Sequence, residues 1–288
     1  MRGFVVYGLR AHSQIDIPGG IPTEASGTPD VTITLAAARA AQSDRIYRFE
    51  GADLCFTAPG IAEYRCRADG IRVTPHPAAG EADVAELLIA TALPALLWIR
   101  GGFVLHAAAA RLAGHDAAIA IAGASGSGKS TVLAQLIGAG GSLLADDTIL
   151  LAARDSGAEA AGLPGGYFMR EGEGRRFHPV PGERALVRTP LAAVLILSHG
   201  DTGALTRVAP VAAVAQLHAN RHRPRVPALL GREGAALADS ALLAGAIPIY
   251  AWRRPAGALD LAAWEWTALA RCAAGNEVGH DGQALAAQ

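Results

Sequence analysis

The sequence predicts a mixed α/β protein, in which a larger core with a central sheet follows a smaller, β-rich N-terminal domain. Hydrophobic residues make up 51% of the 288 residues and charged residues 18%, so the chain can bury a substantial core and is not a disordered protein. Segments before residue 80 alternate in polarity, whereas later apolar runs are continuous, as in buried central strands. A glycine-rich stretch at 123–130 separates one of these runs from a helical segment.

The first 80 residues contain short strands, since apolar and polar residues alternate at 31–35, 54–57, 62–67 and 71–74, with turns at Pro59-Gly60 and Asp69-Gly70. This alternation implies that one face of the sheet is exposed to solvent, so we expect a small antiparallel sheet that covers another layer with its apolar face. Residues 81–98 are rich in Leu and Ala and carry acidic residues in their first turns, which predicts a helix.

Continuous apolar runs dominate the rest of the chain. They predict strands at 103–105, 117–122, 143–145, 148–151, 192–197 and 247–252, and residues 129–137 predict a helix. We therefore expect an N-terminal domain at 1–95, a second domain at 96–272 and a flexible polar tail at 273–288.

Charge and hydropathy exclude several partners. The net charge is −1, with 25 Lys and Arg against 26 Asp and Glu, which gives no electrostatic basis for binding nucleic acid or an anionic membrane. Mean hydropathy is +0.26, but the most apolar stretch, 87–99, contains Thr91 and Pro94 and falls short of the roughly 20 residues of a spanning helix. We find no signal-peptide pattern, and the three cysteines lack CxxC spacing. These observations predict a cytoplasmic, reduced protein.

Residues 123–130 read GASGSGKS and match the phosphate-binding pattern G-x-x-x-x-G-K-[ST] without deviation. Glycines let successive backbone N–H groups converge on phosphate oxygens, and the following helix N-terminus adds partial positive charge. Lys129 can reach the β- and γ-phosphates of ATP, and the Ser130 hydroxyl can ligate Mg²⁺. The predicted ATP-binding residues are Gly123, Ser125, Gly126, Ser127, Gly128, Lys129, Ser130 and Thr131. The alternative is an ordinary Gly/Ser-rich turn.

Lys129 is the only lysine in the sequence, and the other 24 basic residues are arginine. The composition replaces lysine with arginine at every other basic position. The lysine at 129 therefore suggests that this position requires a compact ammonium group rather than a planar guanidinium.

Asp146 and Asp147 follow the predicted strand at 143–145, only 16 positions after Ser130. We expect that strand to be a parallel neighbour of the one before the glycine-rich loop, so that both deliver their carboxyl ends to one crevice. One carboxylate could then hold Mg²⁺ with Ser130, a role we give to Asp147, while the other orients an acceptor hydroxyl. A pair of aspartates in a surface turn is the alternative. His106, at the end of the strand 103–105, taken alone is more often a structural histidine.

The order Leu105-His106, residues 123–130 and Leu144-Ala145-Asp146-Asp147 resembles the HPr kinase/phosphorylase family, over about residues 100–151. Phosphoenolpyruvate carboxykinases share the broader arrangement. The resemblance implies an ATP-dependent serine kinase in which Asp146 is the catalytic aspartate, Asp147 supplies metal contacts and His106 supports them.

Outside this segment the sequence departs from true HPr kinases. The first 95 residues do not resemble their N-terminal domain, and their glycine-arginine signature after the aspartates is not evident. Residues 162–170 with Arg175-Arg176 look closer to the HPr-kinase-related proteins of lasso peptide pathways, which phosphorylate a serine of a precursor peptide.

Two groups of arginines could contact phosphate or substrate. Arg170, Arg175 and Arg176 lie in a glycine-rich segment that either closes over the triphosphate, with Arg170 at the transferring phosphate, or is a solvated loop. Arg221, Arg223 and Arg225 surround Pro224, and we interpret them as a solvated face, with docking of an acidic peptide as the alternative.

The sequence therefore predicts a serine kinase that uses ATP and Mg²⁺ and takes a peptide or protein bearing a serine, such as a lasso precursor. The alternatives are a regulatory ATPase module, a bifunctional HPr kinase/phosphorylase, and a small-molecule or carboxykinase-like enzyme. The oligomeric state stays open, a homo-oligomer included.

Overall fold

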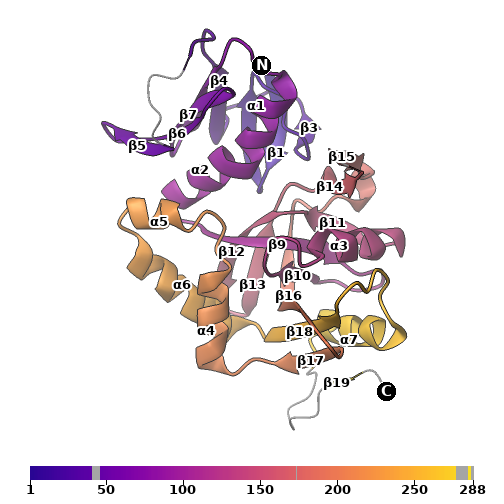
Figure 1. The fold of residues 1–288 in the computed structure, drawn as a ribbon. Helices are drawn as coiled ribbons and strands as arrows, with labels where there is room; N and C mark the ends of the chain where they lie inside the picture. Colours follow the sequence, from indigo (N-terminus) through magenta and orange to yellow (C-terminus); the bar gives the residue numbers. More distant parts are fainter. Residues whose placement is uncertain (41–45, 173, 277–284, 287–288) are drawn as a thin grey trace.

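A computed structural model of the chain describes all residues except 41–45, 173, 277–284 and 287–288. Two large sheets are separated by one long helix (Figure 1). The first sheet has the order β3-β1-β2-β4-β8-β7-β6-β5. Its strands are β1 (Arg2–Val6), β2 (Leu9–Ser13), β3 (Ile21–Thr23), β4 (Val31–Leu35), β5 (Tyr47–Glu50), β6 (Asp53–Ala58), β7 (Ala62–Arg67) and β8 (Gly70–Pro75).

This first sheet confirms the β-rich N-terminal domain but not its antiparallel form. Strand β4 runs parallel to both β2 and β8, so the sheet is mixed. The cause is the placement of β3, which pairs with the far side of β1. The chain then returns to the free side of β2, and it enters β4 in the same direction as β2.

The helix between the sheets consists of α1 (Glu81–Leu87), a π-helical turn η1 (Leu88–Ala92) and α2 (Leu93–Ile99). Among the described residues, Glu81–Ile99 is the one helix long and apolar enough to cross a membrane, but 61% of its apolar window is buried inside the protein. The helix contacts strands of both sheets, and the indole Nε1 of Trp98 donates to the carbonyl of His222 at 2.8 Å. Its apolar surface therefore serves the core. Because α2 continues to Ile99, the expected domain limit at residue 95 falls inside it.

The second sheet has the order β10-β9-β12-β13-β16-β18-β17-β19, β11 also pairs with β9, and β10 also pairs with β16. Its strands are β9 (Phe103–Arg111), β10 (Ala118–Ala122), β11 (Ser142–Ala145), β12 (Thr148–Arg154), β13 (Gly157–Ala161), β16 (Arg188–Gly200), β17 (Ala204–Arg207), β18 (Ile249–Pro255) and β19 (Leu285–Ala286). A separate hairpin, β14 (Gly166–Glu171) and β15 (Gly174–Pro179), is followed by a short 3₁₀ turn, η2 (Gly182–Arg184).

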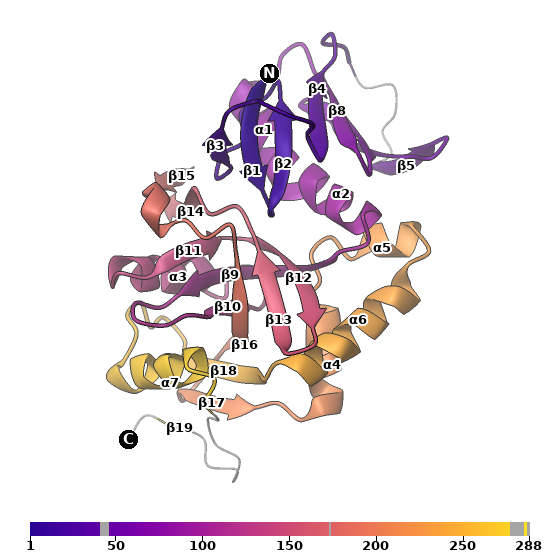
Figure 2. The same ribbon diagram turned by 180° about the vertical axis from the view of Figure 1, so that it is seen from behind.

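Helices cover both faces of this sheet (Figure 2). On one face, α3 (Lys129–Gly138) packs against β9, and α7 (Ala263–Ala273) packs against β10 and β16, in a core that includes Ala108 and Ala110 of β9. On the other face, α2 and α6 (Glu233–Ala246) pack against β9 in a core that includes Ala107 and Ala109, α4 (Pro210–Ala219) packs against α6, and α5 (Arg225–Leu229) contacts α2 and α6. The alternation of alanines along β9 lets helices approach closely on both sides. The predicted mixed α/β core is confirmed.

Two expectations about ends of segments need correction. Strand β9 continues to Arg111, so His106 lies inside a strand rather than at its end. Helix α7 extends to Ala273, the first residue of the expected flexible tail, and most of that tail lies outside the described residues.

Candidate active site

The glycine-rich loop at 123–128, which we call the phosphate loop after its sequence pattern, joins the end of β10 to the start of α3, the context that this pattern requires. Gly123 has φ +142°, and a side chain there would clash with the carbonyl oxygen of Leu197 in β16. Gly128, at φ +91°, is the residue before the first turn of α3. Both positions need a backbone that non-glycine residues rarely adopt. The loop tip, residues 124–126, is exposed.

Lys129 lies folded back against this loop. Its Nζ donates to the carbonyl oxygens of Gly123 at 2.9 Å and Ala124 at 3.2 Å, and the residue is only 7% exposed. Burial lowers the pKa of Lys129, and the nearby Asp147 and Asp146 oppose that shift. A desolvated ammonium at the mouth of a phosphate loop interacts strongly with an anion that enters it.

Other loop residues differ in their surroundings. The Ser127 hydroxyl is buried and has no hydrogen-bond partner among the described residues. Ser125 and Gly126 lie at the exposed tip, and Thr131 follows in the first turn of α3 with its carbonyl accepting from Gln135.

Asp146 and Asp147 occupy a break between two strands that both pair with β9. β11 pairs with residues 109–111 of β9, and β12 pairs with residues 103–106. β10 pairs antiparallel with the opposite side of β9. β10 and β11 are thus parallel to one another, but β9 lies between them. Our expectation that they are adjacent was wrong, although their carboxyl ends do reach the same edge.

Asp146 points toward the phosphate loop. Its Oδ1 accepts a hydrogen bond from the Ser130 hydroxyl at 3.0 Å, and its Oδ2 accepts one from the backbone N–H of Phe168 at 2.8 Å. Burial raises the pKa of Asp146 above its usual value, and these two hydrogen bonds only partly offset the rise. The contact to Ser130 belongs to Asp146 and not to Asp147, the residue that we paired with Ser130 for Mg²⁺.

Asp147 points instead toward two histidines. His106 Nδ1 lies 3.0 Å from the Asp147 backbone carbonyl and 3.4 Å from its carboxylate, and His222 Nε2 lies 3.7 Å from the carboxylate. Burial lowers the pKa of both histidines. The Asp147 side chain is 45% exposed, so it remains accessible to a ligand.

His222 is not among the residues that the sequence predicts for this site. The segment after α4 pairs with β9, since His106 N–H donates to Asn220 at 2.9 Å and His222 N–H donates to Val104 at 2.8 Å. The His222 ring then lies 2.6 Å from the Thr148 hydroxyl. No motif marks this residue. Its neighbour Arg221 is not part of a solvated face, because its side chain is 8% exposed and ion-paired to Glu233.

The donor atoms at this edge suit a divalent cation. Hydroxyl and carboxylate oxygens from Ser130, Asp146 and Asp147 are the hard ligands that Mg²⁺ prefers. His106, Asp147 and His222 also offer ligand atoms within 4.8 Å of one another. His106 Nδ1, however, must donate to the Asp147 carbonyl, because that oxygen only accepts. That ring could then offer only Nε2 to a metal, and the oxygen set is the better fit for Mg²⁺ because this ion prefers oxygen ligands.

The arginines at 170–176 belong to the hairpin β14–β15 and not to an irregular loop. Arg175 lies over the Phe168 ring at 5.1 Å and forms an ion pair with Glu86 of α1 at 3.3 Å. Arg170 is opposite Arg175 in the hairpin, but its side chain is outside what the structure describes.

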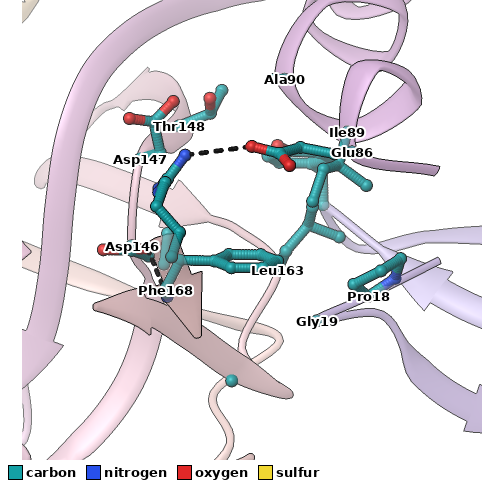
Figure 3. A pocket seen from close by; sticks show the side chains of 14 residues that line it. Pro18, Gly19, Glu86, Ile89, Ala90, Asp146, Asp147, Thr148, Leu163 and Phe168 are labelled. Carbon is teal, nitrogen blue, oxygen red and sulfur yellow. Dashed lines mark hydrogen bonds and ion pairs between the residues drawn. The ribbon is translucent and has the colours of Figure 1, made fainter. Parts of the chain in front are cut away.

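A cavity of about 60 Å³ lies against the two aspartates, between the first sheet, α1–η1 and the second sheet (Figure 3). Pro18 and Gly19 lie across it from Asp146 and Asp147, and Glu86 and Ile89 of the helix form another wall. We name it the aspartate cavity. Its lining residues are Tyr7, Pro18, Gly19, Glu86, Ile89, Ala90, Ala145, Asp146, Asp147, Thr148, Leu163, Gly166, Phe168 and Arg175.

Comparisons with known proteins add little to this geometry. No family model matches the sequence, and no curated protein matches it. Among solved structures, the chain is similar to the Hpr(Ser) kinase/phosphatase from Coxiella burnetii, with 15% identity and a TM-score of 0.34. That match covers 58% of this chain and 93% of the other.

Proposed function

We propose that the protein is a kinase that transfers the γ-phosphate of ATP to a serine hydroxyl of a peptide or protein. One observation carries the proposal: Asp146 contacts Ser130 of the phosphate loop and also lines the aspartate cavity. A single carboxylate therefore lies between a triphosphate-binding loop and a space that could receive an acceptor hydroxyl. Phosphoryl transfer needs the attacking and leaving oxygens in line at the γ-phosphorus, and a carboxylate in this position can orient the acceptor hydroxyl for that attack.

The chain's own groups have distinct roles in this reaction. Loop amides and Lys129 bind the phosphates, and Ser130 and Asp147 hold Mg²⁺, which when bound neutralises phosphate charge. The serine oxygen attacks the γ-phosphorus as the bond to the ADP oxygen breaks, and Asp146 accepts the hydroxyl proton. Its raised pKa makes Asp146 a better base than an exposed aspartate. Positioning supplies most of the rate because even a raised aspartate is a weak base.

The choice of serine rests on the motifs shared with the HPr kinase/phosphorylase family. Within that choice, the segment after the aspartates favours a ribosomal precursor peptide, such as a lasso precursor, over HPr. We further propose that the enzyme works in the cytoplasm, since Cys55, Cys66 and Cys272 are free and buried.

The test is incubation with γ-labelled ATP, Mg²⁺ and three acceptors in parallel: a serine-containing precursor peptide, the HPr protein and no acceptor. Mass spectrometry should find a gain of about 80 Da on a peptide serine, and D146N should abolish it. Labelled HPr would favour the bifunctional kinase. Free phosphate alone, with no labelled acceptor, would overturn the proposal in favour of a regulatory ATPase.

A further inference from the structure

A second and larger cavity lies on the first sheet, beside α1. It has a volume of about 600 Å³ and is formed by the start of β1, the segment after β2, the ends of β4 and β8, and residues of α1. We name it the helix groove. Its lining residues are Arg2, Gln14, Ile15, Asp16, Pro18, Leu35, Ala38, Pro75, His76, Pro77, Ala79, Glu81, Ala82, Val84 and Ala85.

The helix groove adjoins the aspartate cavity. Pro18 lines both, and the chain passes directly from groove residues to cavity residues at Pro18-Gly19 and at Ala85-Glu86. The same helix thus forms a wall of each. On average, the helix residues that line the helix groove lie about five positions before those that line the aspartate cavity. At 1.5 Å per residue, this separation is about 8 Å. An extended peptide covers that distance in two to three residues.

The lining of the helix groove is mainly aliphatic. Ile15, Val84 and Ala85 form buried walls, three proline rings add apolar surface, and Leu35 remains 47% exposed. Among the charged lining residues, Arg2 and Asp16 pair with one another at 3.1 Å and are well exposed, and Glu81 at the start of α1 is also exposed. Burial of an aliphatic side chain in such a groove lowers the free energy of binding. Among its described lining residues, the groove has no buried, unpaired charge that would favour a polar side chain instead.

We propose that the helix groove binds an aliphatic side chain of the substrate peptide, two to three residues from the acceptor serine. The inference rests on the proposed function for the position of the serine. In this proposal the N-terminal sheet and α1 recognise the peptide, while the second sheet holds the nucleotide. A peptide without an aliphatic residue at that spacing is a poor substrate.

The test uses short polar peptides with one serine and one leucine two or three residues before or after it, and a leucine-free host. Fluorescence anisotropy measures binding of labelled versions in which alanine replaces the serine, and mass spectrometry measures phosphorylation of the serine versions. We expect at least one leucine peptide to bind about tenfold more tightly than the host. L35Q should remove that advantage, while L237Q, at a leucine 50% exposed on α6, should keep it.

A second pair of variants blocks the groove rather than weakening it. A82W places a bulky ring at an exposed groove position of α1, and A215W makes the same change at an exposed position of α4. Only A82W should reduce peptide binding. Equal binding of all peptides, or equal loss in both tryptophan variants, would overturn the inference even if serine is phosphorylated. Leucine-dependent binding without any phosphorylation would instead support peptide binding in the helix groove and overturn the proposed kinase activity.

Discussion

The Ser130 hydroxyl donates a hydrogen bond of 3.0 Å to Asp146, and this bond connects the first turn of α3 to the break between β11 and β12. The other oxygen of Asp146 accepts from the backbone of Phe168, which lines the aspartate cavity. The phosphate loop and the cavity wall are therefore linked through one half-buried carboxylate. A change at Asp146 should therefore affect phosphoryl transfer more than it affects binding of the nucleotide at the loop or of the acceptor at the cavity.

The variant D146N should abolish phosphoryl transfer while leaving the affinity for ATP within about threefold. The amide keeps the size of the side chain and an oxygen for a hydrogen bond, but it cannot take up the proton of the acceptor. Steady-state transfer and calorimetric titration with an ATP analogue measure the two quantities separately.

The variant D147N is the matched comparison, because the two positions are adjacent. Its expected effect is a higher Mg²⁺ requirement, with transfer partly restored at high Mg²⁺. If instead D146N raises the Mg²⁺ requirement and D147N removes transfer at every Mg²⁺ concentration, the two roles are exchanged, as the contact between Ser130 and Asp146 would permit.

The variant K129R should weaken binding of an ATP analogue by about 10-fold or more, although the charge is kept. The ammonium of Lys129 lies between two loop carbonyls in a site that is almost fully buried, and a planar guanidinium is larger. Calorimetric titration measures the change. R154K, at a half-exposed arginine of β12, is the control and should bind normally. Normal binding by K129R would show that the single lysine of the sequence carries no special requirement.

The variant G123A should destabilise the fold and remove nucleotide binding, because an added methyl group meets the Leu197 carbonyl and φ is +142°. The variant G126A also has a positive φ, +82°, but no heavy atom lies within 4 Å of an added methyl group. We expect a loss of about 1–3 kcal/mol of unfolding free energy for G123A, and a smaller loss for G126A, measured by urea unfolding. Equal losses would mean that backbone strain alone, and not the approach to β16, decides the requirement for glycine.

The elements that could be predicted from the sequence are those specified by local pattern. The phosphate loop is a contiguous motif between an apolar run and a helix, and its glycines are explained by backbone angles at the same positions. The long helix, expected at 81–98 and found at Glu81–Ile99, was also predictable, since its sequence is rich in Leu and Ala and carries acidic residues in its first turns. Local sequence is enough where neighbouring residues determine the conformation.

Pairing between distant segments was not predictable. Nothing in residues 103–111 reveals that β9 lies between β10 and β11, or that the segment at His222 pairs with Val104 across more than 100 residues. His222 could be found only from the folded chain, because its role depends on this pairing. The parallel partners of β4 were missed for the same reason.

We expect His222 to make the stability of the protein depend on pH. Burial lowers its pKa to about 3, whereas an unfolded histidine titrates near 6.5. Between these values the unfolded chain takes up a proton that the folded protein does not, so stability is complete above about pH 6.5 and falls as the pH is lowered toward 3. For one such histidine the loss between pH 6.5 and 5 is about 2 kcal/mol.

The variant H222N should reduce this acid sensitivity. At pH 7.5 it should cost about 1 kcal/mol for the contact to Thr148, but its unfolding free energy should fall less than that of the parent between pH 7.5 and 5. H115N, at the turn before β10, is the control and should keep the parent's pH profile. Urea unfolding at several pH values measures the difference. Parallel profiles for the parent and H222N would mean that the neutral His222 beside Asp147 does not limit stability in acid.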